Sequence, residues 1–111
     1  MATNSVNKVI LVGNLGDDIT LNQTSGGTHV ASFSVATNEK WRDKQTGQEQ
    51  KSTEWHRVVV WGKLAEITAT YLKKGSKVYV EGKMKTRKWQ DNGGIDRYSS
   101  EIVADDVKFL D

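Results

Sequence analysis

Cysteine is absent from this chain of 111 residues, which excludes disulfide bonds and thiolate metal sites. No apolar run approaches the ~20 residues that a membrane-spanning helix needs. The first eight residues contain neither an apolar signal core nor an arginine-rich amphipathic presequence. These absences predict a cytoplasmic protein without a membrane anchor, and the length fits a single domain over residues 1–111.

The net charge is also small, at +2, but it is distributed unevenly along the chain. Between residues 73 and 97 there are eight basic residues and three acidic ones, a balance of +5. A basic stretch on a nearly neutral domain is typical of a nucleic-acid binder. The alternative is a lysine-rich, solvated face that keeps the protein soluble. The basic residues are Lys73, Lys74, Lys77, Lys83, Lys85, Arg87, Lys88 and Arg97.

The most informative stretch is residues 53–62, which has the composition of a β-strand. Because side chains alternate across a strand, Trp55, Arg57 and Trp61 share one face, while valines on the other face indicate a core. Aromatic rings beside positive charge are what exposed nucleobases bind. Burial of this strand on both faces, with both tryptophans in a core, is the alternative.

The whole chain predicts a five-stranded Greek-key barrel, the OB-fold, with one helix between the third and fourth strands. The helix is predicted over residues 64–72, with Ile67 and Tyr71 on its core face. Residues 14–27 suggest a bent extended segment, 39–52 a solvated connection or protruding hairpin, and 104–111 a short edge strand. The predicted strands are residues 6–13, which read as buried on both sides, 29–38, 53–62, 78–89 and 96–103, with a hairpin turn at 90–94.

The four tryptophans are the candidate binding site, because none occupies an obvious core position in a clean alternation. In a barrel this small they could line one groove with neighbouring basic side chains. Stacking accepts any base and needs exposed base faces, which predicts sequence-independent binding of single strands. The candidates from this reasoning are Trp41, Trp55, Trp61, Trp89, Lys85, Arg87 and Lys88.

Several motifs also resemble the bacterial single-stranded DNA-binding protein family, in collinear order over nearly the whole chain. The resemblance implies an OB-fold homotetramer that wraps and protects single-stranded DNA during replication, recombination and repair, in the nucleoid. The motifs are N-K-V-I-L-V-G-N-L-G at 7–16, W-R-D at 41–43, T-E-W-H-R-V-V-V-W-G-K-L-A-E at 53–66, Y-L-K-K-G-S at 71–76, V-Y-V-E-G at 78–82 and T-R-K-W at 86–89.

The resemblance also assigns residue roles. The stacking aromatics of the family fall on the four tryptophans, of which Trp61 is more often phenylalanine. His56 resembles a histidine at the family's subunit interface. The family's basic DNA contacts map onto Lys8, Arg57, Lys63, Lys73, Lys74, Arg87 and Arg97.

Two departures from the family pattern stand out. Family members usually have a proline soon after the first strand, whereas this chain has Ile19 after Gly16-Asp17-Asp18. The sequence given ends at Asp111 without the family's Gly/Gln/Pro-rich linker and acidic tip. The sequence is therefore either the DNA-binding core of a longer protein or a naturally tailless form, and partner proteins recruited through that tip are not expected from this chain.

Other function classes find less support in the sequence. A nuclease would need clustered carboxylates for a metal, and the pairs Asp17-Asp18 and Asp105-Asp106 have no histidine at ligand spacing. No catalytic residue, metal or cofactor is therefore predicted. A primosome-type interaction module would not need four indoles. Single-stranded RNA remains an alternative ligand, since stacking does not read the 2′-hydroxyl.

Overall fold

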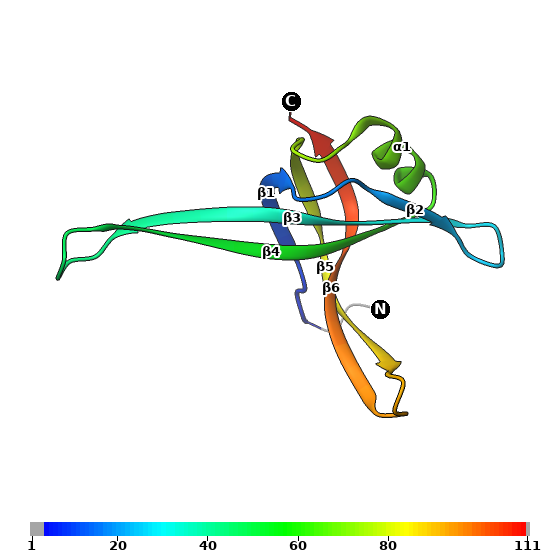
Figure 1. Ribbon diagram of the computed structural model, residues 1–111. Helices are drawn as coiled ribbons and strands as arrows, with labels where there is room; N and C mark the ends of the chain where they lie inside the picture. Colours follow the sequence, from blue (N-terminus) through cyan, green and yellow to red (C-terminus); the bar gives the residue numbers. More distant parts are fainter. Residues whose placement is uncertain (1–3, 111) are drawn as a thin grey trace.

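The fold is a closed β-barrel with a single helix, in a computed structural model that describes residues 4–110. Strands pair in the order β1-β5-β6-β4-β3-β2, and a further β1–β3 pairing closes five of them into a barrel (Figure 1). The predicted OB-fold is confirmed. The elements are β1 (Val9–Leu15), β2 (Thr20–Gln23), β3 (His29–Arg42), β4 (Glu49–Trp61), α1 (Lys63–Tyr71), β5 (Lys77–Gln90) and β6 (Asp96–Phe109).

The core is formed by the inward faces of the long strands. On β3, Ala31, Phe33 and Val35 alternate with partly exposed residues and are almost completely buried, as predicted. Their β4 partners include Val58 and Val60, both fully buried. Burying side chains of this size stabilises the fold by ~1.5–3 kcal/mol each. The central parts of β3 and β4 are thereby fixed, and with them the direction of their outer faces.

The helix lies between β4 and β5, and not between the third and fourth strands as predicted. The helix lies close to its predicted place along the chain. The prediction did not count the short strand β2 as a separate strand, so the strands that follow it are numbered one higher in the structure. Thr20 to Gln23 pair with β3, from Thr20↔Ser32 to Gln23↔His29. All four residues of β2 are exposed, so the segment lacks the apolar alternation that indicates a strand in a sequence.

The core face of α1 also differs from the prediction. Ile67 is 37% exposed and Tyr71 is 68% exposed, with the Tyr71 ring beside Phe109 at a centroid distance of 5.8 Å. Ala65 and Thr68 are the buried residues of the helix. A nine-residue helix that covers one end of a barrel touches the core along a narrow stripe, which passes beside Ile67 and Tyr71.

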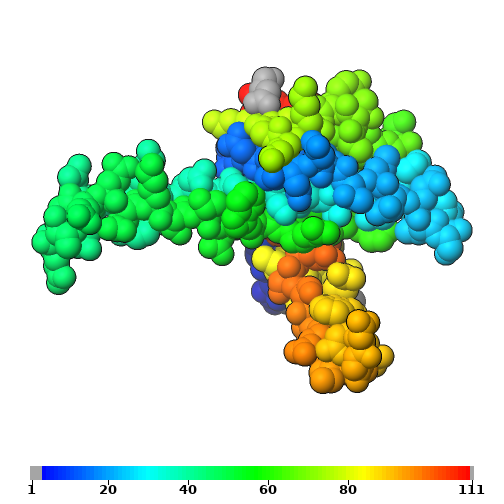
Figure 2. All heavy atoms as spheres, in the orientation of Figure 1, coloured from blue at the N-terminus to red at the C-terminus, as the bar shows by residue number. Residues whose placement is uncertain are grey.

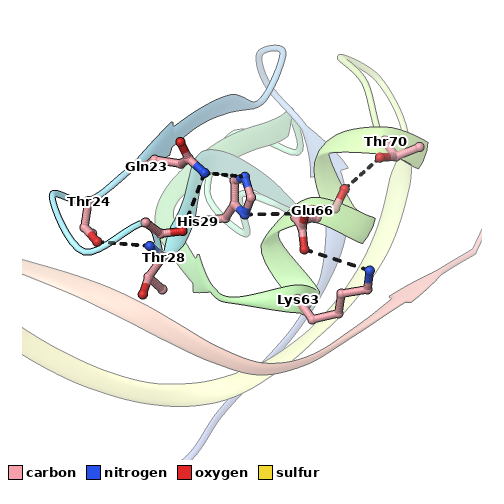
Figure 3. Close-up of polar contacts among 8 residues, drawn as sticks. Gln23, Thr24, Thr28, His29, Lys63, Glu66 and Thr70 are labelled. Carbon is pink, nitrogen blue, oxygen red and sulfur yellow. Dashed lines mark hydrogen bonds and ion pairs between the residues drawn. The ribbon is translucent and has the colours of Figure 1, made fainter.

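Polar contacts join the helix to the β2–β3 hairpin. The His29 ring lies between two side chains, with Nε2 at 3.2 Å from Gln23 Nε2 and Nδ1 at 3.4 Å from Glu66 Oε1 (Figure 3). The backbone carbonyl of His29 accepts a hydrogen bond from the Gly62 N–H at 2.8 Å. These contacts hold the start of α1 against the β2–β3 hairpin.

Two hairpins project beyond the barrel as arms (Figures 1 and 2). The β3–β4 ladder continues to the pair Arg42↔Glu49, so most of the predicted 39–52 connection is a paired ribbon with a short turn. The β5–β6 ladder continues to Gln90↔Asp96. The radius of gyration is 16.7 Å, whereas a compact chain of this length has ~13 Å. Much of the surface therefore belongs to the arms.

Strand β6 runs without interruption to Phe109, so the separate edge strand predicted over 104–111 is part of β6. A register shift at Glu81 and Gly82 lets β5 follow this long partner around the barrel. A Cβ at Gly82 would overlap the Val103 carbonyl, which explains the glycine. Residues 1–3 and 111 of the predicted domain lie outside the described residues.

The outer face of β1 is open to solvent. Ile10 is 55% exposed and Val12 is 49% exposed, so the predicted burial of this strand on both sides is wrong for the single chain. The described part of the chain contains no helix with the length and apolarity needed to cross a membrane.

Candidate nucleic-acid interface

The outer face of β4 carries two exposed indoles. Trp55 is 61% exposed and Trp61 is 49% exposed. Their partners on β3 are Ala36 and Val30, whose small side chains leave the rings uncovered. Burial of both tryptophans in a core, the alternative for this strand, is therefore wrong.

Two contacts organise the residues around these indoles. A Cβ at Gly16 would overlap the Trp55 ring, so the indole lies directly against the Gly16 backbone. Arg57 lies between the two tryptophans in the alternation, and its Nη2 donates a hydrogen bond to Ser32 Oγ at 3.2 Å. The guanidinium is thus held along the sheet face that carries Trp55 and Trp61.

The β5–β6 arm presents a second set of basic and aromatic side chains. Alternation places Lys83, Lys85, Arg87 and Trp89 on one face, as predicted. Trp89 is 41% exposed, and its Nε1 donates a hydrogen bond to Ser99 Oγ at 2.9 Å. This bond fixes the ring orientation while one indole face stays accessible.

The outer face of β4 and the β5–β6 arm meet in a groove beside the barrel, which we call the central groove. It consists of two adjoining hollows of about 380 and 280 Å³, and Trp61, Arg87 and Glu101 line both. Either hollow is large enough for a nucleobase. The first is also lined by Lys83, Lys85, Thr86 and Val103, and the second by Val30, Ser32, Arg57 and Val59.

Glu101 is the groove residue that sequence reasoning missed. It pairs with Lys85 across the β5–β6 ladder, and its side chain is only 16% exposed. The Arg87 Nε lies 3.9 Å from Glu101 Oε1. The hairpin turn at 90–94 contains the signal that could have found it, because counting back along both strands from that turn places Glu101 opposite Lys85.

Two predicted residues lie on the opposite face of the β3–β4 ribbon. Trp41 is 49% exposed and pairs with Gln50 near the tip, out of phase with Trp55. His56 is partly buried, with its Nε2 at 2.9 Å from Thr37 Oγ1. The groove thus brings together Trp61, Arg57, Lys85 and Arg87. Trp55 shares the β4 face with Trp61 but does not line the hollows, and Trp41 and His56 lie on the ribbon's other side.

The remaining predicted basic residues surround the groove at a distance. Lys8, Lys63, Lys73, Lys74, Lys88 and Arg97 are not among the residues that line the two hollows. Several of them pair with a nearby carboxylate: Lys8 with Glu81 at 3.6 Å, Lys63 with Glu66 at 3.9 Å, Lys88 with Asp96 at 3.3 Å and Arg97 with Asp91 at 2.9 Å.

One of the two carboxylate pairs considered for catalysis, Asp17-Asp18, makes hydrogen bonds to the backbone. Asp17 accepts a hydrogen bond from the Ser34 N–H at 3.3 Å, and Asp18 accepts one from the Lys74 N–H at 2.9 Å. Across residues 4–110, no group of three or more histidine, aspartate or glutamate side chains could hold a metal ion. The described residues thus offer an aromatic, basic groove for binding.

Comparison with known proteins agrees with this geometry. Residues 6–110 match the single-strand binding protein family. A Plasmodium falciparum single-stranded DNA-binding protein, solved in complex with single-stranded DNA, has 39% sequence identity and a TM-score of 0.87, with both chains covered completely.

A second similar structure is a deletion mutant of the single-stranded DNA-binding protein from Thermus aquaticus. It has 28% identity and a TM-score of 0.82, over 96% of this chain and 51% of that one. This chain therefore spans about half the length of that protein. Since the family match covers nearly every residue from β1 to β6, the chain belongs to the single-strand binding protein family.

Proposed function

We propose that this protein binds single-stranded DNA in the central groove, by base stacking and phosphate attraction, with little dependence on sequence. The observation that carries the proposal is the exposed Trp61 with Arg57 and Arg87 in the groove between β4 and the β5–β6 arm. In single-strand binding proteins, stacking on an aromatic side chain contributes roughly 1 to 3 kcal/mol per base. A duplex hides its base faces and therefore gains no stacking free energy from the indoles.

The path of the strand follows the exposed indoles. Trp55, Trp61 and Trp89 supply stacking surfaces on the two arms, with Arg57, Lys85 and Arg87 as the nearest cations. The DNA continues beyond the groove toward Trp41 and the outlying basic residues. These are Lys8, Lys63, Lys73, Lys74, Lys88 and Arg97.

The biological role follows from this chemistry. A single domain over residues 1–111 coats and protects single-stranded DNA in replication, recombination and repair, in the cytoplasm and without catalysis of its own. Proteins of this family act as tetramers. In our proposal His56 contributes to the contact between subunits.

Competition between matched oligomers tests the proposal. The protein is titrated with labelled oligo(dT), and unlabelled oligo(dT), a duplex of equal length and the corresponding RNA compete for it. We expect the unlabelled single-stranded DNA to displace the label and the duplex to fail. Equal displacement by the duplex would contradict stacking, and stronger displacement by RNA would make RNA the ligand.

A further inference from the structure

The carboxylate of Glu101 has no role in the function proposed above. A negative charge in a groove for a polyanion weakens binding unless it makes a contact of its own. Glu101 nevertheless lines both hollows beside Trp61. Its position therefore needs a reason beyond general attraction to phosphates.

The hydrogen-bonding capacity of Glu101 is largely unused. Its side chain is 16% exposed, and the nearest cation is Arg87, with Nε at 3.9 Å from Oε1. That separation is too long for a hydrogen bond. Within residues 4–110, no hydrogen bond to the Glu101 carboxylate is present, although a carboxylate accepts about four.

A bound strand changes the surroundings of this carboxylate. A base that stacks on Trp61 fills the hollow and removes Glu101 from water, which is unfavourable unless the ligand supplies a donor. Phosphate and sugar-ring oxygens are acceptors and cannot help. Cytosine N4, adenine N6 and guanine N2 carry amino groups that can donate, whereas thymine has carbonyl oxygens at the corresponding ring positions. The one donor of thymine, N3–H, lies between two carbonyl oxygens that repel an approaching carboxylate.

We propose that Glu101 accepts a hydrogen bond from the amino group of a base stacked on Trp61, and so makes this one position favour amino-bearing bases over thymine. The inference rests on the proposed function, because it assigns a base-edge contact within the same groove. The other stacking positions show no preference for a base, so each protein chain discriminates at only one of the bases that it binds.

The test uses three short oligomers that differ at one central base. Each is a thymidine oligomer of about ten nucleotides, within the range that one barrel of this kind covers. The central base is thymine, cytosine or N4,N4-dimethylcytosine, which keeps the ring and lacks the donor hydrogens. Affinities are measured for the wild type, for Glu101→Gln and for Asp105→Asn, an exposed position on the same strand that does not line the hollows.

For the wild type and Asp105→Asn, we expect cytosine to bind about 5- to 10-fold tighter than thymine, and dimethylation to abolish this advantage. In Glu101→Gln the three oligomers should bind almost equally, because an amide can also donate to thymine. The change in net charge by itself would raise the three affinities by the same factor, so it cannot account for a loss of the cytosine preference.

Three results would overturn the inference: no cytosine advantage in the wild type, an advantage that survives in Glu101→Gln, or one that survives dimethylation. A uniform loss of affinity in Glu101→Gln would make Glu101 a support for Arg87. Failure of the wild type to bind any of the three oligomers would overturn the proposed function as well. The two failures are thus distinguishable.

Discussion

Small residues beside the indoles decide how much ring surface a ligand can reach. Ala36 leaves one face of Trp55 open, while the Gly16 backbone supports the ring from another direction. An indole that is both supported and exposed is ordered before DNA arrives. Less side-chain entropy is then lost on binding.

Gly16→Ala tests this support. The added Cβ would overlap the outer edge of the Trp55 ring, which is free to tilt toward solvent, so we expect little change in stability. Part of one stacking contact is lost, and binding of single-stranded DNA should weaken by up to ~1 kcal/mol, or several-fold. Thermal unfolding and oligo(dT) titration measure the two effects.

Gly26→Ala is the matched control, because a Cβ there meets nothing closer than Thr24 Oγ1 at 3.9 Å. It should leave both the Trp55 emission spectrum and the affinity unchanged. Equal affinity of the Gly16 and Gly26 variants would show that the Gly16 contact does not position Trp55 for binding.

At the scale of elements, the tip of the β5–β6 arm is organised by one carboxylate. Asp91 Oδ1 accepts hydrogen bonds from the N–H groups of Gly93 at 2.9 Å and Ile95 at 3.1 Å, and Oδ2 accepts one from Arg97 Nε at 2.9 Å. The bond from Ile95, then that from Arg97, holds the pKa of Asp91 below its ordinary value of 3.8. Trp89 lies just before this turn.

Acid should therefore loosen this arm at an unusually low pH. A lowered pKa means that the contacts are fully present above pH 3.8 and are lost as the pH falls through the lower, folded value. The amide resonances of Gly93 and Ile95, followed by NMR against pH, should titrate with a midpoint below 3.8. Asp91→Asn should remove this titration, and a midpoint at or above 3.8 in the wild type would contradict the account.

Sequence periodicity predicted much of this fold because most strands have one buried face. The alternation at Phe33 and Val35 and the shared face of Trp55 and Trp61 are confirmed. The extended segment predicted over residues 14–27 contains β2, but local patterns could not show that its four exposed residues pair with β3, or that Tyr71 of α1 is exposed. Both depend on how an element lies against the barrel.

The groove itself depends on pairing between strands that are distant in sequence. Strands β4 and β6 meet in parallel over only two pairs, Val58↔Ile102 and Val59↔Val103. This short contact brings Glu101 to the groove that Trp61 lines, and no periodicity within either strand indicates it. The candidate tryptophans were predictable as exposed aromatics. The hairpin turn could have placed Glu101 opposite Lys85, but its position beside Trp61 was not predictable.

At the scale of the whole molecule, the two arms give a small barrel a long aromatic and basic surface. The principal dimensions are 56 × 38 × 38 Å, and the two arms project from the barrel in different directions (Figure 2). The central groove lies between β4 and the β5–β6 arm. The net charge is only +2, so attraction to DNA comes from local cations such as Arg57 and Arg87. The logarithm of the binding constant should therefore fall as the salt concentration rises. For each phosphate contact, the expected fall is about 0.7 per log unit of salt.

The most direct test of the central claim is the quenching of tryptophan fluorescence by oligo(dT), at low and high salt, in the wild type, Trp61→Phe and Trp41→Phe. We expect strong quenching at saturation, a midpoint that shifts to higher DNA concentration with salt, and a larger loss of quenching for Trp61→Phe than for Trp41→Phe. Saturable binding with little quenching, or equal losses in the two variants, would contradict stacking in the central groove.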